Sequence, residues 1–232
     1  MSIIKKLLSI FGIGGSNGQS QQNGNLDLLQ RVREQRAGNF PKITNWVVDN
    51  YHTSVKFRVL HMGISEVVGK FKEFQAEFKG SSPDFTSMEI IASVNVNSVE
   101  TDMLARDAHL KSPDFFDTEK YPFIEFRSTS VQWRPFRSFK LNGNLTIKGI
   151  TKPISLEGKI VNFLPKDMFG QPRIGFEING EINRKDFGLL WQMELESGDK
   201  VVDEIIKIEI HAEIATKESI EAMNNYLKQM GG

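Results

Sequence analysis

The four histidines are the side chains best suited to hold a metal ion or move a proton, and their spacing supports neither role. His52 and His61 are nine residues apart, so on one regular strand they face opposite sides. His109 falls in a predicted helix and His211 on an outward strand position, and no H-x-x-x-H or H-E-x-x-H spacing occurs. The sequence therefore predicts no metal site.

The segment Thr101–Leu110 brings an acid, a base and an imidazole close together. On a helix, Asp102 and Arg106 would be i,i+4 partners, and Arg106 and His109 would be i,i+3 partners. One interpretation is a solvated helix face with an ion pair. The other is an anion clamp over the mouth of a binding cavity, with Arg106 as its strongest candidate.

Two further polar side chains fall on strand positions that otherwise point inward. His61 ends one apolar strand face, and Arg184 continues the face of Ile182. One interpretation of His61 is a rim histidine with a satisfied hydrogen bond, and one interpretation of Arg184 is a rim charge that reaches water. The other interpretation of each is a contact to the head group of a ligand.

Motifs for phosphate binding and nucleophilic catalysis are absent from the sequence. A G-x-S-x-G string at residues 14–18 lies in a linker, without the strand and helix that a nucleophile elbow needs. There is no cysteine, and Lys+Arg equals Asp+Glu at 29 each, which excludes thiol chemistry and a global basic field. The sequence therefore predicts no catalytic residue, no cofactor and no nucleic-acid partner.

Most of the region 43–214 is predicted to form β-strands, because apolar and polar residues alternate through it. These strands must position the polar side chains named above. For example, Val55 and Phe57 share one face, and Lys56 lies on the other. Eight segments show this pattern: residues 54–61, 74–79, 87–96, 124–129, 139–148, 154–160, 173–182 and 206–214.

The predicted fold is all-β, an eight-stranded antiparallel β-barrel with two helical additions. One apolar and one polar face per strand favour antiparallel pairing, and closure removes exposed edges, although a sandwich would satisfy the same pattern. A short helix, Asp102–Leu110 capped by Thr101, is expected between the third and fourth strands. A C-terminal helix is expected over Thr216–Met230. Its apolar stripe consists of Ile220, Met223, Leu227 and Met230.

Small residues on the inward faces bear on whether the barrel holds a ligand. They are Ala76, Ala92, Ser128, Gly143, Gly158, Gly180 and Ala212. One interpretation is that they leave unfilled volume, and the other is that they relieve crowding where strands bend. A cavity lined by Ile, Val, Leu and Phe would favour a hydrocarbon tail over a sugar or nucleotide, whose polar groups would lose their hydrogen bonds.

The first 40 residues form an N-terminal extension, in which 12–25 are a flexible Gly/Ser/Asn/Gln linker. Lys5 and Lys6 precede a short apolar run, and three interpretations stay open: a surface or membrane-touching amphipathic helix, a cleaved signal, or a frayed terminus. The expected location is cytoplasmic with peripheral membrane contact through residues 1–11, or periplasmic if a signal is cleaved. No apolar run is long enough for a transmembrane helix.

Several motifs, in order from about Trp46 to Ile214, resemble the YceI-like family. The longest is W-V-V-D-x-x-H-T-S-V-x-F-x-V-x-H-x-G-I-S-x-V-x-G-x-F, at Trp46–Phe71. The others are Arg106-Asp107-x-His109-Leu110, Phe115-Phe116-Asp117, Tyr121-Pro122-x-Ile124-x-Phe126-x-Ser128, Gly143-x-Leu145-Thr146-Ile147-x-Gly149-Ile150-Thr151 and Arg184-x-Asp186-Phe187-Gly188. The long linker and weak leader depart from the secreted members.

This resemblance implies a lipocalin-like barrel that binds a polyisoprenoid or isoprenoid quinone, often as a homodimer. The domains are then an extension at 1–40, the barrel at 41–215 and a C-terminal helix at 216–232. The expected ligand-binding residues combine inward phase with the resemblance. For the tail they are Phe57, Val59, Phe126, Leu145, Phe176 and Ile208, and for the head group His61, Arg106, His109 and Arg184.

The main functional hypothesis is a lipid carrier that is not an enzyme. One alternative is an enzyme acting on a lipid-like substrate at the barrel mouth, where Arg106, Asp107 and His109 are the only local candidates. Another is an interaction protein tethered to a membrane by residues 1–11, which is compatible with lipid carriage.

Overall fold

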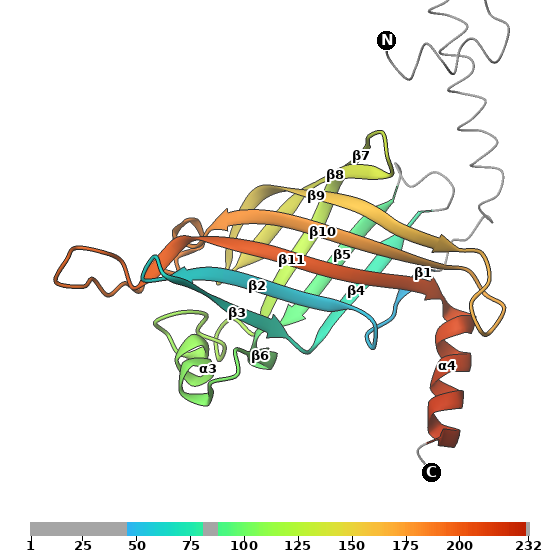
Figure 1. The fold of residues 1–232 in the computed structure, drawn as a ribbon, viewed down its shortest axis with the longest axis horizontal. Helices are drawn as coiled ribbons and strands as arrows, with labels where there is room; N and C mark the ends of the chain where they lie inside the picture. Colours follow the sequence, from blue (N-terminus) through green and yellow to red (C-terminus); the bar gives the residue numbers. More distant parts are fainter. Residues whose placement is uncertain (1–45, 81–87, 231–232) are drawn as a thin grey trace, which may run out of the picture. The chain divides into compact units, whose positions relative to one another are not determined.

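The computed structural model describes residues 46–80 and 88–230, whose arrangement is shown in Figure 1. The strands are β1 (Trp46–Val48), β2 (Ser54–His61), β3 (Ser65–Phe71), β4 (Phe74–Lys79), β5 (Glu89–Asn95), β6 (Val99–Glu100), β7 (Phe123–Trp133), β8 (Ser138–Ile147), β9 (Ile150–Leu164), β10 (Arg173–Asn183) and β11 (Val202–Thr216). The helices are α3 (Leu104–Lys111) and α4 (Lys217–Met230), with short 3-10 turns η2 (Val96–Ser98) and η3 (Arg184–Phe187). The predicted extension at 1–40 lies outside the described residues.

The strands form one closed antiparallel barrel. Hydrogen-bonded neighbours follow the order β4-β5-β7-β8-β9-β10-β11, and β1 closes the ring by pairing with both β11 and β4. β2 pairs with β11 next to β1, and β3 pairs with β2. Thus β1 with β2, and β3 with β4, each make one interrupted strand of the wall. The wall then has eight strands, so the predicted eight-stranded antiparallel barrel is confirmed.

Two parts of this wall, β1 and β3, were missed by the sequence pattern. Strand β1 has only three residues, too few for alternation to show. In β3 the positions opposite the inward Val59, Phe57 and Val55 are Val67, Gly69 and Phe71. A glycine on the inward face and an exposed Val68 on the outward face hide the period of two.

Helix α3 lies between β6 and β7, as predicted, but it begins at Leu104 and Thr101 does not cap it. Instead the Thr101 hydroxyl and backbone N–H both donate to Asp107 Oδ1, at 2.5 and 2.9 Å. Arg106 donates to the Thr101 hydroxyl at 2.7 Å and to its carbonyl at 2.6 Å. The expected ion pair with Asp102 is not found among the described residues, because Asp102 precedes the helix with a positive φ of 59°.

Helix α4 continues directly from β11, and the predicted C-terminal helix is confirmed. Ser219 and Met223 are buried in its first half, whereas Leu227 and Met230 are 41% and 70% exposed. The predicted apolar stripe is therefore covered only near the barrel. Within the part of the chain that the structure describes, no helix is long and apolar enough to cross a membrane.

Three inward glycines accept the aromatic rings of neighbouring strands. Phe57 lies over Gly69, Phe126 over Gly143 and Phe139 over Gly158, so closely that a Cβ on any of these glycines would overlap the ring. The glycines thus let three large side chains lie against the wall, because close approach needs a residue without Cβ.

A guanidinium joins β10 to the residue after β1, to β11, to α4 and to the loop before β10. Arg173 donates to Asp49, and it donates to Glu213 Oε1 at 2.6 Å and to the Ser219 hydroxyl at 3.0 Å. It also forms an ion pair with Asp167 at 3.3 Å, and the Ser219 hydroxyl donates to the same carboxylate. This cluster fastens the start of the barrel and the last helix to β10.

The two aspartates of this cluster are held as carboxylates. Burial alone would raise the pKa of Asp49, but hydrogen bonds from His52 and Arg173 lower that pKa below its usual range. Burial also opposes ionisation of Asp167, yet hydrogen bonds from Ser219 and two backbone N–H groups lower its pKa. Their ionised forms are therefore favoured by folding.

Replacing Gly158 with Ala should lower the free energy of unfolding by about 1–3 kcal/mol, because the new methyl group displaces the Phe139 ring. Urea titration measures this loss. Gly175→Ala is the matched control, since a Cβ there meets Val161 at an ordinary 3.7 Å. Equal stabilities of the two variants would contradict the role given to the ring.

Replacing Arg173 with Met should lower the free energy of unfolding by about 3–5 kcal/mol near neutral pH, because buried Asp49 and Asp167 lose their cation. The stabilisation by these carboxylates is present above their unfolded pKa near 3.8 and is lost as pH falls through the lower folded pKa. The deficit of the variant should therefore shrink below about pH 4.

Arg134→Met is the control for this prediction, because the Arg134–Glu157 ion pair is exposed and should contribute less than about 1 kcal/mol. Urea titrations of both variants across pH make the comparison. A deficit in Arg173→Met that does not change with pH would show that lost packing, and not lost charge, destabilises it.

Candidate ligand-binding cavity

The barrel encloses a cavity of about 280 Å³ with an almost wholly apolar lining. This volume is close to the lower end of the range for small-molecule pockets, about 300–1,000 Å³. All six residues predicted to contact a tail lie on its wall, and so does Arg184. The six are Phe57, Val59, Phe126, Leu145, Phe176 and Ile208. Their role in binding remains a prediction, but inward phase has placed them correctly.

One end of the cavity is covered by the insertion that follows β6. Leu110 from α3, with Phe115 and Phe116 from the segment after it, line the cavity and pack with the barrel residues Leu145 and Ile147. Phe187 and Leu189, which follow β10, join the same cluster and are also buried. These side chains shield this end of the cavity from solvent.

Arg184 is built into this covered end. It is only 2% exposed, and its guanidinium donates to the carbonyls of Asp203 and Leu189 at 2.9 and 2.5 Å and to Gln192 Oε1 at 2.6 Å. Burial lowers its pKa below the usual range, against the opposing charges of Glu204 and Asp203. The interpretation of Arg184 as a rim charge in water is therefore wrong, because its buried guanidinium donates its hydrogen bonds to the chain itself.

The other three predicted head-group residues are not among those that line the cavity. His61 lies at the end of β2, opposite Ser65 and Val202. Arg106 binds Thr101, as described above. The ring of His109 is hydrogen-bonded to Asp114 at 2.9 Å.

The same His109 ring packs edge-on against two aromatic rings. Its centroid lies 5.0 Å from that of Phe115 and 5.1 Å from that of Trp191. The structure thus brings His109 to the outer side of the end cover. Arg184 lies in the cavity wall, so the four predicted head-group residues do not form one cluster around an opening.

The small inward residues have two different effects. Ala76, Ala92 and Ala212 line the cavity and leave room in it. Gly143 and Gly158 are covered by phenylalanine rings, and Gly180 is covered by Leu156. Both interpretations of the small residues therefore apply, each to a different subset.

Several lining residues had no signal in the alternation pattern. They are Phe71, Leu110, Phe115, Phe116 and Leu189. Phe71 ends β3 at the bend before β4, and the others lie outside the barrel strands and pack back onto the lumen. A strand period cannot identify them, although Phe115 and Phe116 belong to a motif of the family resemblance.

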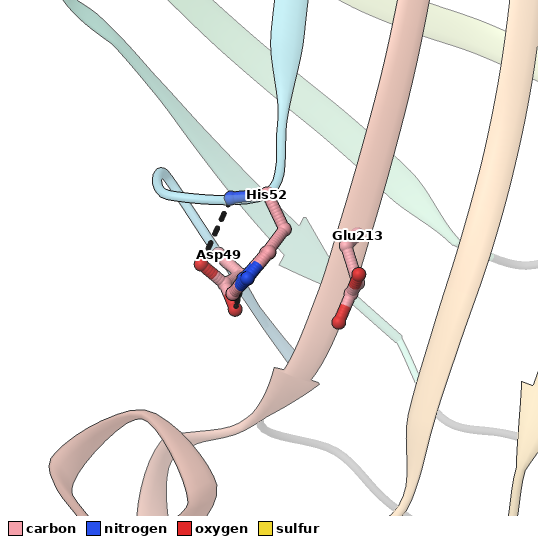
Figure 2. A group of neighbouring side chains, drawn as sticks. All are labelled: Asp49, His52 and Glu213. Atoms are coloured by element: carbon pink, nitrogen blue, oxygen red, sulfur yellow. Dashed lines mark hydrogen bonds and ion pairs between the residues drawn. The ribbon is translucent and has the colours of Figure 1, made fainter. Parts of the chain in front are cut away.

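Three potential metal ligands lie together on the outside of the barrel (Figure 2). Ligand atoms of Asp49, His52 and Glu213 fall within 4.8 Å of one another. His52 Nδ1 is hydrogen-bonded to Asp49 at 2.9 Å, and Arg173 already contacts both carboxylates. Since a guanidinium supplies the positive charge that a cation would bring, this group is explained as part of the Arg173 cluster.

The chain is similar to a known protein family. The model of the YceI-like domain matches residues 46–214. Protein YceI of Escherichia coli O157:H7 is 37% identical over 161 residues, which cover 69% of this chain and 82% of that protein.

Two solved structures share the barrel. Burkholderia cenocepacia BcnA superposes with a TM-score of 0.62 and 19% identity, covering 72% of this chain and 98% of that one. A polyisoprenoid binding domain from Saccharophagus degradans gives a TM-score of 0.56 and 12% identity, covering 75% and 99%. These two likenesses establish the fold, and with it the expected lipocalin-like barrel. Because the family model spans the whole barrel, this chain belongs to the YceI-like family.

Proposed function

We propose that the barrel binds a long-chain apolar lipid, a polyisoprenoid or an isoprenoid quinone, and carries or sequesters it without chemical conversion. The observation that carries this proposal is the enclosed cavity with its almost wholly apolar wall. The description of the Saccharophagus degradans neighbour as a polyisoprenoid binding domain supports the same ligand class.

The lining selects the ligand through desolvation. A sugar or nucleotide would leave hydrogen-bonding groups unpaired in this lumen, at a cost of about 1–3 kcal/mol each. A hydrocarbon tail would gain about 0.8 kcal/mol for each buried CH₂. The tail is assigned to the wall formed by Phe57, Val59, Phe126, Leu145, Phe176 and Ile208.

An enzyme acting on a lipid-like substrate is the weaker candidate. Arg106 and Asp107 are both hydrogen-bonded to Thr101, which fixes α3 to the segment before it. His109 is bound to Asp114 outside the cavity. Turnover abolished by His109→Ala, with lipid retention intact, would favour this alternative.

The remaining expectations about partners and location concern other parts of the chain. Peripheral membrane contact is proposed for residues 1–11, which lie outside the described residues. We also propose a homodimer and a cytoplasmic location, or a periplasmic location if a signal is cleaved. Liposome co-sedimentation lost on deleting residues 1–11 would support the membrane contact.

Native mass spectrometry of the purified full chain, followed by organic extraction, tests the proposed ligand class. We expect a co-purifying molecule with a repeating isoprene mass, or uptake of added prenyl lipids. A folded protein that is empty and also refuses added prenyl lipids and quinones would overturn the proposal.

Replacing Ala92 with Phe should reduce lipid uptake at least about tenfold, because the new ring occupies the lumen in which a tail would lie. Asn144→Phe is the control, since Asn144 is exposed on the outer face of β8. Thermal unfolding verifies that both variants fold, and native mass spectrometry measures retained lipid. Unchanged uptake by a folded Ala92→Phe protein would place the ligand outside the barrel.

A further inference from the structure

The barrel wall is interrupted at the same level in two adjacent strands. The first wall strand breaks at residues 49–53, between β1 and β2, and the second breaks at 72–73, between β3 and β4. Ladder pairing between these strands stops at Val55 with Phe71 and resumes only at Val47 with Glu77. We call this interruption the wall break.

The cavity reaches the wall break. Val48 and Thr53 on one side of it, and Phe74 and Gln75 on the other, all line the cavity. The other margin of the first strand stays closed, because Asp49 and Thr53 are hydrogen-bonded to the backbone of Glu213 on β11. The break therefore opens toward β4, and not toward β11.

A second hollow adjoins the cavity at this point. This groove of about 580 Å³ shares Phe74 and Gln75 with the cavity, and we call it the lateral groove. Its other lining residues are Asn50, Lys72, Glu73, Ser93, Asn95 and Phe123. At the wall break an apolar lumen thus lies beside a polar surface groove, which is the arrangement that a lipid with a polar end requires.

The charged side chains of the lateral groove are already paired. Lys72 Nζ donates to Glu100 Oε1 at 2.5 Å, and Asn95 Nδ2 donates to Glu73 Oε2 at 2.6 Å. A diphosphate head group would need several uncommitted cations. Among the described residues that line this groove, the one cation, Lys72, is bound to a carboxylate. The groove is therefore poorly suited to a strongly anionic head.

Uncharged groups in the lateral groove are available to a ligand. The side chains of Asn50, Gln75 and Ser93 have no hydrogen-bond partner within residues 46–80 and 88–230. Phe123 exposes 52% of its surface beside them. Two amides and a hydroxyl suit carbonyl and hydroxyl oxygens, and an exposed ring suits the flat face of another ring.

We propose that the lipid leaves the lumen through the wall break and that the lateral groove binds its head group, an uncharged oxygen-bearing group such as a quinone ring. This inference rests on the proposed function and specifies it. It places the head group on the side of the barrel. The end near α3, where His109 lies, is closed by buried Phe115, Phe187 and Leu189.

The test compares ligands with the same kind of tail and different heads, added to the full chain and measured by titration with native mass spectrometry. Squalene has no head group, and a short-chain ubiquinone and a prenyl diphosphate supply uncharged and anionic heads. In the variant combining Asn50→Ala and Gln75→Ala, quinone affinity should fall about tenfold, the loss of roughly two hydrogen bonds, while squalene affinity stays unchanged. Both positions are exposed, so the variant should fold, which thermal unfolding verifies.

Gln132→Ala is the matched control, because Gln132 is exposed on the outer face of β7 away from the groove; it should leave both affinities unchanged. Wild-type quinone binding that survives in the Asn50/Gln75 variant, or that is lost in His109→Ala instead, would overturn the lateral groove. Tighter wild-type binding of the diphosphate than of the quinone would overturn the uncharged head. If squalene, the quinone and the prenyl diphosphate all fail to bind the wild type, the proposed function itself fails.

Discussion

The lumen of this barrel depends on how large aromatic rings are accommodated in a narrow, closed sheet. An eight-stranded barrel is only just wide enough to be filled by its own side chains. Phe57, Phe126 and Phe139 would fill it if their rings crossed the centre. Each ring instead lies over a glycine of a neighbouring strand, so that it occupies space along the wall and not at the centre of the barrel. Alanines at other inward positions keep the remaining space open.

The two ends of the barrel are stabilised by different chemistry. Near α3, buried aromatic side chains cover the lumen, and Arg184 donates to backbone carbonyls of β11 and of the loop that leads to it. Near α4, Arg173 forms ion pairs with carboxylates from the residue after β1, from β11 and from the loop before β10. Both guanidiniums are used by the fold, because a planar group with five donors can join several segments at once. A basic side chain on an inward phase is thus not by itself a sign of a ligand.

In the proposed binding mode, the interruption of the wall lets a lipid with a polar end place its tail in the lumen and its head outside it. Such a molecule needs a dry surface for its tail and hydrogen-bonding groups for its head, and the two must be continuous. The bends between β1 and β2 and between β3 and β4 suspend ladder pairing locally while the barrel remains closed above and below them. The same bends supply polar residues that line the lateral groove.

The sequence by itself determined the fold class, the eight-strand count, both helices and six wall residues of the cavity. Alternation of apolar and polar residues records which side of a strand faces away from water, and this preference is local. The family resemblance, carried by motifs such as that at Trp46–Phe71, is likewise a property of the sequence.

Only the tertiary structure decided what the polar residues do and where the lumen ends. From the sequence, Arg106 and Arg184 could each bind either a ligand or the chain itself. In the structure each donates hydrogen bonds to backbone carbonyls, whose positions no sequence pattern gives. Residues such as Leu110 and Phe115 line the cavity from an insertion that folds back onto the barrel, which no strand period records. The alternation pattern determines which side of its own strand a residue faces, whereas contacts between strands and loops are set by closure of the whole barrel.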